Sequence, residues 1–265
     1  MHTWHWRSWQ ELPYLSCSLL EKFPHGFFTQ QFWSHSLEDM TKILHPEASV
    51  YRLKQVHGNK VLTPREIEYK LTVGGDEVEQ VGEKTLAKAD GVISEQPLQA
   101  LWTASADCTP ALIGDIKTKQ VAAVHAGWRG TAKKIIPQAI SRMQSQGSQL
   151  QDLRIALGPA IAGEVYQVSE DVAAQLGSTL LPYEDEKTIV DALHELPDSP
   201  LISDPEPGKV RVNVRQVSAL QMEQLGISPE QISIAPYCTY QNPENFFSYR
   251  RAKEKKVQWS GIVSI

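Results

Sequence analysis

The stretch VAAVHAGWRGTA, residues 121–132, changes character within a few positions. It begins as an apolar run typical of a buried strand, passes through a histidine, two glycines, a tryptophan and an arginine, and ends as the start of a helix. A strand that runs directly into a helix predicts a domain that mixes both kinds of element. It also places His125 at the end of a strand, where a sheet can aim a side chain into a cleft.

Further strand-like and helical segments lie on both sides of this stretch. Apolar runs predict strands at residues 50–57, 88–95, 100–108, 111–116, 120–126, 153–160, 209–214, 231–237 and 258–265. Helical periodicity is clearest at residues 131–146, 169–177 and 214–226, and Pro137 indicates a kink in the first of these or a later start. The order has no regular βαβ rhythm. We therefore expect a mixed α/β or α+β domain and not a doubly wound parallel sheet.

The chain of 265 residues is long enough for a single domain with a sizeable core. Hydrophobic residues make up 41% and charged residues 22%, as in ordinary globular proteins. We expect one domain over residues 1–265. Two stretches predict surface insertions: the charged residues 65–88 with a Gly-Gly turn, and the acidic, proline-rich residues 182–208 with a short helix near 189–196.

Charge, hydropathy and cysteine content indicate which partners and which cellular compartment to expect. The 26 basic and 31 acidic residues give a net charge of −5, which disfavours nucleic acids and anionic membranes as partners. No run approaches the roughly 18 apolar residues of a membrane span, and the start lacks a signal-peptide pattern, so we expect a cytoplasmic protein. Cys17, Cys108 and Cys238 are too widely spaced for a disulfide scaffold, which favours reduced thiols.

Three potential metal ligands each close a predicted strand: His57, Cys108 and His125. Two imidazoles and a thiolate match the donors that hold a catalytic zinc ion with a fourth position open for water. The alternative is a core cysteine with two hydrogen-bonded histidines, and separations of 51 and 17 residues do not by themselves favour the metal.

Several blocks, in order, look like the signature segments of the YfiH/YlmD family. They are KQVHGNKV (54–61), KADGVIS (88–94), TASADCTPALIGD (103–115), VAAVHAGWRGT (121–131), LGPAIAGEVYQVSEDV (157–172) and CTYQNPENFFSYRR (238–251). The resemblance runs from about residue 25 to residue 263. It implies a layered fold with β-sheets packed centrally and helices outside, with a metal site in a surface cleft. It also implies zinc ligands at His57, Cys108 and His125.

The family carries the labels laccase-domain protein and polyphenol oxidase, and is also described as a multifunctional purine nucleoside enzyme. The resemblance therefore implies phosphorolysis of adenosine, inosine, guanosine or methylthioadenosine, and deamination of adenosine. Purine nucleosides and inorganic phosphate would be the partners, and the oligomeric state is left open. An open zinc position lowers the pKa of water to about 7, which suits attack on C6 of adenine.

Residues beside the metal ligands are candidates for substrate binding. Gly127 and Gly130 permit close backbone approach to a ligand, and Arg129 offers a bidentate donor suited to phosphate. The alternative is a tight turn with a surface arginine. Asp107 and Gln55 stand close to the ligands in sequence and could orient them or the substrate. For Asp107 a direct catalytic role and a capping role are both open.

In FFSYRR, residues 246–251, aromatic residues alternate with Ser248 and Arg250 as they would on a strand. Ser248 and Arg250 would then share one face, and Arg250 would contact an anion if that face meets the cleft. Cys238 has no ligand role in its block and is expected to be structural. Gln30 stands where the family usually has an arginine, which predicts weak phosphorolysis or an altered substrate if that arginine binds phosphate or nucleoside.

Two other functions stay open. A copper-type polyphenol oxidase is disfavoured because the chain has eight histidines and no His-x-His pair, although the site could bind copper in vitro. A hydrolase that edits peptidoglycan precursors could use Cys108 as nucleophile with histidine as base, and would not need a metal. A non-catalytic binding module is disfavoured because it would not account for the Cys/His/His set.

Overall fold

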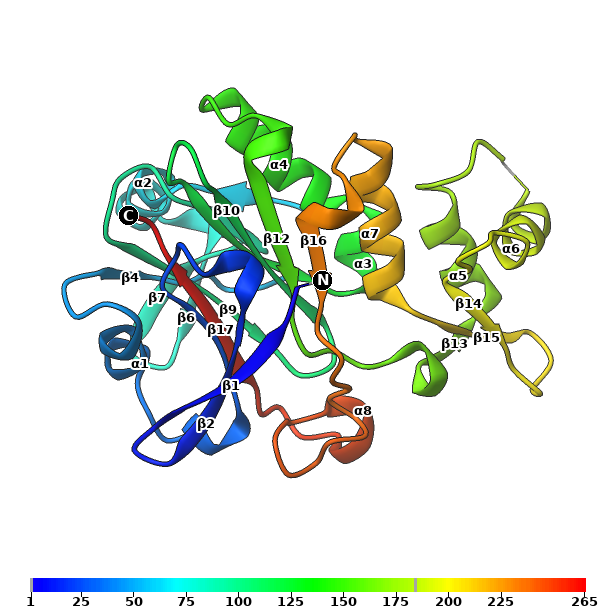
Figure 1. The fold of residues 1–265 in the computed structure, drawn as a ribbon, viewed down its shortest axis with the longest axis horizontal. Coiled ribbons are helices and arrows are strands. Elements are labelled where there is room, and N and C mark those ends of the chain that lie inside the picture. Colours follow the sequence, from blue (N-terminus) through cyan, green and yellow to red (C-terminus); the bar gives the residue numbers. More distant parts are fainter. Residues whose placement is uncertain (1, 184) are drawn as a thin grey trace.

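The computed structural model describes residues 2–183 and 185–265, and within them two six-stranded sheets form the centre of the molecule (Figure 1). The first sheet has the order β1 (Trp4–Trp9), β2 (Leu12–Cys17), β3 (His25–Phe28), β17 (Gln258–Val263), β9 (Gln99–Ser105), β4 (Ser49–Tyr51). The second has the order β16 (Ile232–Ile234), β12 (Leu153–Leu157), β10 (Thr109–Asp115), β11 (Val121–Ala126), β8 (Gly91–Ile93), β5 (Val61–Leu62). Most neighbouring strands are antiparallel, so the expectation of a fold other than a doubly wound parallel sheet is confirmed.

Alternation along the strands decides which side chains lie between the sheets. In β3, β9 and β17, Phe27, Leu101 and Ile262 face the second sheet and share one core with its Leu112 and Ala123. The residues that neighbour them in sequence pack outward with α1 (Leu37–Leu44), which covers the first sheet from outside. The outer face of the second sheet packs against α4 (Ile135–Ser145) and α7 (Val214–Gln224). Central sheets with helices outside are therefore confirmed.

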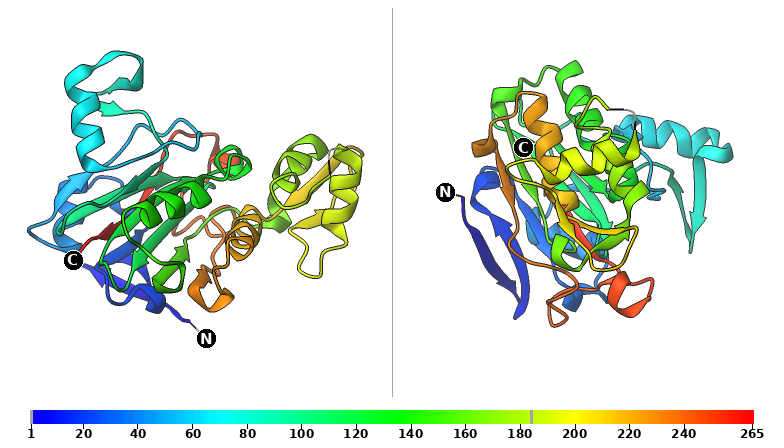
Figure 2. Two further views of the ribbon diagram at one scale, coloured as in Figure 1. Left: turned by 90° about the horizontal axis from the view of Figure 1, so that it is seen from above. Right: turned by 90° about the vertical axis from the view of Figure 1, so that its right-hand side faces the viewer.

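A side lobe, residues 166–212, stands at one edge of the sheets (Figure 2). It consists of a small sheet, β13 (Gln167–Ser169), β15 (Lys209–Val212) and β14 (Leu201–Ser203), with α5 (Glu170–Gly177) and α6 (Glu186–His194). The apolar cluster of the lobe also includes Val214 and Val217 of α7, and Trp128 packs against it. The described residues of the stretch 182–208, that is all but residue 184, lie in this lobe. Helix α6 confirms the short helix expected near residues 189–196.

The stretch 65–88 forms α2 (Pro64–Val73) followed by the hairpin β6 (Val78–Val81) and β7 (Lys84–Ala87). Thr63 and Glu66 cap α2 reciprocally, and the helix starts at Pro64, where a proline costs no hydrogen bond. The hairpin holds the segment before His57, because Lys54 forms an ion pair with Glu79 at 2.6 Å.

Two expected elements, the strand at 50–57 and the helix at 131–146, differ in the structure. The strand expected at 50–57 ends at Tyr51, and the rest is a loop that pairs only at Lys54. The helix expected at 131–146 is two helices, α3 (Trp128–Ala132) and α4, because Lys134 between them adopts a left-handed conformation with φ +57°. Pro137 falls in the first turn of α4, where it needs no hydrogen-bond donor. In the described part of the chain, every helix is too short or too polar to cross a bilayer.

Candidate metal centre

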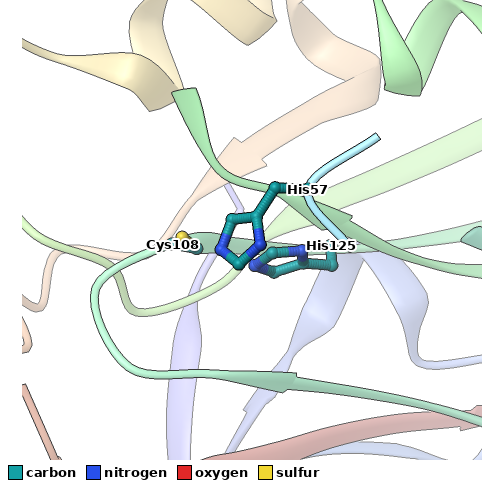
Figure 3. Close-up of side chains that lie close together, drawn as sticks. All are labelled: His57, Cys108 and His125. Atoms are coloured by element: carbon teal, nitrogen blue, oxygen red, sulfur yellow. The ribbon is translucent and has the colours of Figure 1, made fainter. Parts of the chain in front are cut away.

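Three side chains from separate parts of the second sheet and its loops converge at one point (Figure 3). The ligand atoms of His57, Cys108 and His125 all lie within 4.8 Å of one another. His125 comes from β11 and is buried, Cys108 is half-buried in the turn between β9 and β10, and His57 is exposed. Neither His57 nor Cys108 ends a strand as expected. His57 stands in the loop before β5 with φ +59°, and Cys108 lies in the turn that follows the end of β9 at Ser105.

The electrostatics of the cluster favour a thiolate. Burial by itself would raise the pKa of the Cys108 thiol, but the nearby His125 and His57 lower it to about 6. Burial would lower the pKa of His125, but the Cys108 thiolate and Asp90 raise it to about 9. The two imidazole rings stand nearly perpendicular, with centroids 4.9 Å apart. Without a metal the cluster therefore pairs a Cys108 thiolate with a protonated His125 at neutral pH, and metal binding would displace the His125 proton.

Asp90 is a residue that the sequence analysis missed. Its side chain is fully buried and contacts both histidines: Oδ1 lies 2.9 Å from His125 Nδ1 and accepts a hydrogen bond from the backbone N–H of His57 at 2.9 Å. Burial tends to raise the pKa of Asp90, and the hydrogen bonds from His125, Gly58 and His57 lower it below its ordinary value. The sequence signal was the block KADGVIS, where an acidic residue interrupts a buried apolar run.

Asp107 precedes Cys108 and has both carboxylate oxygens engaged. Oδ1 accepts from the Thr239 hydroxyl at 2.7 Å, and Oδ2 accepts from the backbone N–H of Arg250 at 2.6 Å. The residue has φ +92°, a conformation that side chains rarely adopt. These contacts attach the turn in which Cys108 stands to the C-terminal segment of the chain. Asp107 also lines the pocket beside Cys108.

Two other candidates do not face the cluster with free polar groups. Gln55 donates to the carbonyl of Ala104 and accepts from its N–H, both at 2.8 Å, so its amide ties the His57 loop to β9. Ser248 is buried, and its hydroxyl caps α8 (Tyr249–Ala252) by accepting from the N–H of Arg251. The strand expected for FFSYRR is thus wrong, because this cap turns the chain into a short helix.

Both arginine candidates stack on aromatic rings. The Arg250 guanidinium lies 4.8 Å from the ring centre of Tyr166 and donates to the carbonyl of Gln167 at 3.0 Å. Arg129 is exposed and lies 4.3 Å over Trp128. Burial and the charges of Cys108 and Asp107 raise the pKa of Tyr166 to about 12, although Arg250 and Arg129 oppose this rise. Tyr166 is a second site residue that sequence reasoning missed. Its place in the block LGPAIAGEVYQVSEDV (157–172) was the sequence feature that could have indicated it.

The two glycines are required for different reasons. A Cβ at Gly127 would lie 2.7 Å from the Cys108 sulfur, so this glycine makes room for a ligand atom. A Cβ at Gly130 would lie 3.1 Å from the carbonyl of Gly58, so this glycine lets α3 approach the His57 loop. The close approach at Gly127 is to the Cys108 sulfur, and the approach to a bound substrate stays a prediction.

A pocket of about 30 Å³ opens beside the Cys108 sulfur, between the body and the side lobe. Its walls are Asp107, Cys108, Thr109, Ala126, Gly127, Trp128, Ile161, Tyr166 and Val214. The space suits about one water molecule or a single substrate group.

All three cysteines are free. Cys238 is buried and its sulfur accepts from the N–H of Ala162, which agrees with a structural role. Gln30 donates to the carbonyl of Pro243 at 2.6 Å and so braces the segment that leads to Arg250.

Stacked sheets with helices outside, and a His/Cys/His cluster formed by strand β11 and two loops, define an α/β protein with a candidate mononuclear metal centre. The family model described as multi-copper polyphenol oxidoreductase laccase matches residues 34–264, and the chain belongs to this family, which includes YfiH and YlmD. A Synechocystis protein named purine nucleoside phosphorylase is 46% identical over 264 residues, covering 98% of this chain and 97% of the relative. A Mycobacterium tuberculosis protein of the same name is 30% identical over 206 residues, covering 78% and 68%.

Solved structures agree on the fold. The crystal structure of YlmD from Geobacillus stearothermophilus superposes with a TM-score of 0.78 at 21% identity and covers 98% of both chains. That of YfiH from Bacillus licheniformis gives 0.75 at 22% identity and covers 98% of this chain and 99% of its own. The layered fold that the family resemblance implied is thereby confirmed.

Proposed function

We propose that this protein is a zinc-dependent purine nucleoside phosphorylase that also deaminates adenosine. The observation that carries the proposal is the 46% identity, over nearly the whole length of both chains, to a Synechocystis protein named purine nucleoside phosphorylase. Adenosine, inosine, guanosine and methylthioadenosine are the proposed nucleosides, and inorganic phosphate is the second substrate.

The residues of the cluster fit zinc. Two imidazole nitrogens and a thiolate within 4.8 Å of one another form a three-ligand set of the kind that leaves a position open for substrate or water. The lowered pKa of Cys108 supplies the thiolate, and Gly127 leaves space beside it. A zinc ion bound by His57, Cys108 and His125 would supply Lewis-acid polarisation of the group beside it.

The two arginines are the proposed anion contacts. In phosphorolysis a phosphate oxygen bonds to C1′ of the ribose while the bond from C1′ to the purine nitrogen breaks, and the base leaves with a proton. Arg129 is exposed and offers its donors to phosphate, and Arg250, held over Tyr166, keeps further donors beyond its bond to Gln167. Gly127 and Gly130 flank Arg129 and shape the backbone that carries it. Asp107, with Gln55 and Ser248, holds these parts in place, and a direct catalytic role of Asp107 stays a prediction.

Two alternatives are separated by their metal requirement. A multicopper oxidase needs several copper ions, whereas within the described residues one group of three His, Cys, Asp or Glu side chains could hold a metal. That group would also accept copper in vitro. A peptidoglycan-precursor hydrolase would use the Cys108 thiolate and His125 without metal, and chelation would leave it active.

The test is a chromatographic assay on purified protein of measured zinc content. Each of the four nucleosides is supplied with and without phosphate to the wild type and to His125→Ala, and the products from adenosine separate the two reactions. We expect adenine only with phosphate, inosine without it, and neither with the variant. The matched control is His194→Ala, an exposed histidine of α6 in the side lobe.

Each outcome decides one part of the proposal. Full zinc occupancy without turnover of any of the four nucleosides would overturn the purine function. Turnover that survives complete zinc removal would overturn the metal dependence and favour the cysteine nucleophile. Inosine without adenine would retain deamination and reject phosphorolysis.

A further inference from the structure

We propose that Asp90 is a positioning residue that fixes both imidazole ligands of the metal centre with a single carboxylate. The inference rests on the metal centre in the proposed function. It adds a residue that neither donor chemistry nor spacing singles out, since Asp90 contacts two of the candidate ligands and is not one of the three residues that could hold the metal.

Both oxygens of Asp90 are saturated by groups that belong to the ligands or their loop. Oδ1 accepts from His125 Nδ1 and from the N–H of His57, each at 2.9 Å. Oδ2 accepts from the N–H of Gly58 at 2.7 Å and of Val56 at 3.2 Å. The backbone carbonyl of Asp90 also accepts from the N–H of His125 at 2.7 Å. One residue thus contacts His125 twice and three successive amides around His57.

The contact with His125 selects a tautomer. An ionised carboxylate only accepts hydrogen bonds, so the hydrogen between the two residues must belong to Nδ1 of the ring. In the neutral imidazole that assignment leaves the lone pair on Nε2, the nitrogen available to a metal. Such a carboxylate also makes the ring a better donor and fixes its orientation.

The contact with the His57 loop fixes a backbone that would otherwise be unfavourable. His57 has φ +59°, the left-handed region that residues other than glycine seldom adopt. Three consecutive N–H groups converge on the Asp90 carboxylate, and this holds the loop in that shape although His57 itself is exposed. The direction of the first ligand therefore depends on Asp90 as well.

The substitution Asp90→Asn tests this arrangement because it keeps the shape and removes the charge. With the amide NH₂ toward Gly58 and Val56, two sets of donors face each other and the loop is released. With the NH₂ toward His125, the ring must accept at Nδ1 and carry its hydrogen on Nε2, which blocks the metal-binding nitrogen. Neither orientation accepts from all the donors that the carboxylate serves.

The experiment measures the zinc dissociation constant by competition with a chromophoric chelator, with the fold of the metal-free protein followed by circular dichroism. We expect Asp90→Asn to fold and to bind zinc about 10- to 100-fold more weakly than the wild type. The matched control is Asp115→Asn at the far end of β10, where an equally buried carboxylate accepts from the N–H groups of Lys117 and Thr118. Its zinc affinity should equal that of the wild type.

The outcomes separate this inference from the proposed function. Equal zinc affinity of Asp90→Asn and the wild type would overturn the positioning role. A wild type that binds no zinc would reject the metal centre itself. If Asp90→Asn does not fold, the metal-bound wild type is examined by imidazole ¹⁵N NMR, and a hydrogen on Nε2 of His125 in place of Nδ1 would overturn the proposal.

Discussion

The backbone of Gly127 passes so close to Cys108 that a Cβ there would lie 2.7 Å from the sulfur. Gly127 has φ −71° and ψ 168°, which any residue adopts, so the constraint is steric and not conformational. We expect Gly127→Ala to displace the thiolate, to weaken zinc binding, and to lower the free energy of unfolding by about 1–3 kcal/mol through overpacking. Zinc titration and urea denaturation measure the two effects.

A double-mutant cycle checks whether contact with the Cys108 sulfur causes the predicted loss of stability. In a Cys108→Ala background the sulfur is gone, and the same glycine substitution should cost less free energy of unfolding. An equal cost in both backgrounds would place the clash elsewhere.

The two histidine ligands should differ in what they do for the fold. His125 is buried and hydrogen-bonded to Asp90, so His125→Ala leaves a buried carboxylate short of a donor and should lower the free energy of unfolding by about 1–3 kcal/mol. His57 is exposed, so His57→Ala should change it by no more than about 0.5 kcal/mol. Both should lose zinc. Denaturation in the presence of a chelator measures the difference, and equal destabilisation would contradict it.

The sequence predicted those strands and site residues that a local pattern of residue types is enough to identify. Apolar runs located β10, β11 and β17 within a residue or two, because these strands are buried along their length. His57, Cys108 and His125 could be identified because their donor chemistry is visible in the residue type, and the resemblance implied the same three residues. The loop of His57 was taken for a strand, because nothing in VYRLKQVH reveals that Asp90 holds its backbone in a left-handed turn.

The missed features depend on contacts between distant segments. Asp90 lies 35 positions from His125, and its role appears only when the chain brings the two together. The alternation in FFSYRR indicated a strand, but the Ser248 hydroxyl caps a helix whose first N–H groups include that of Arg250, bonded to Asp107. Tyr166 belongs to the side lobe, and its place beside Cys108 follows from how that lobe packs on the sheets.

The proposed phosphate contacts predict a specific kinetic change. Arg129→Ala should raise the KM for phosphate about tenfold, since it removes charge-assisted hydrogen bonds, while zinc affinity stays unchanged. Arg65→Ala, an exposed arginine of α2, is the control. An unchanged KM for phosphate in Arg129→Ala would make that residue a solvated surface charge.

A buried histidine away from the metal centre predicts how stability depends on pH. His25 of β3 is buried, with one ring nitrogen accepting from the N–H of Cys17 at 2.9 Å and the other 2.8 Å from the carbonyl of Phe23. Burial lowers the pKa of His25 below its ordinary value, although the contact with Phe23 opposes this. The folded protein therefore keeps His25 neutral where the unfolded chain already takes up a proton.

The sign of the effect follows from proton uptake. The contribution of His25 to stability is complete above the unfolded pKa of about 6.5 and is lost as the pH falls from there toward the lower folded pKa, because the unfolded state then binds the extra proton. The loss approaches at most about 1.4 kcal/mol per pH unit. In His25→Gln, whose amide oxygen can still accept from Cys17, this component should vanish. Urea denaturation of both proteins between pH 5 and 8 measures it, and parallel curves would show that His25 does not titrate with folding.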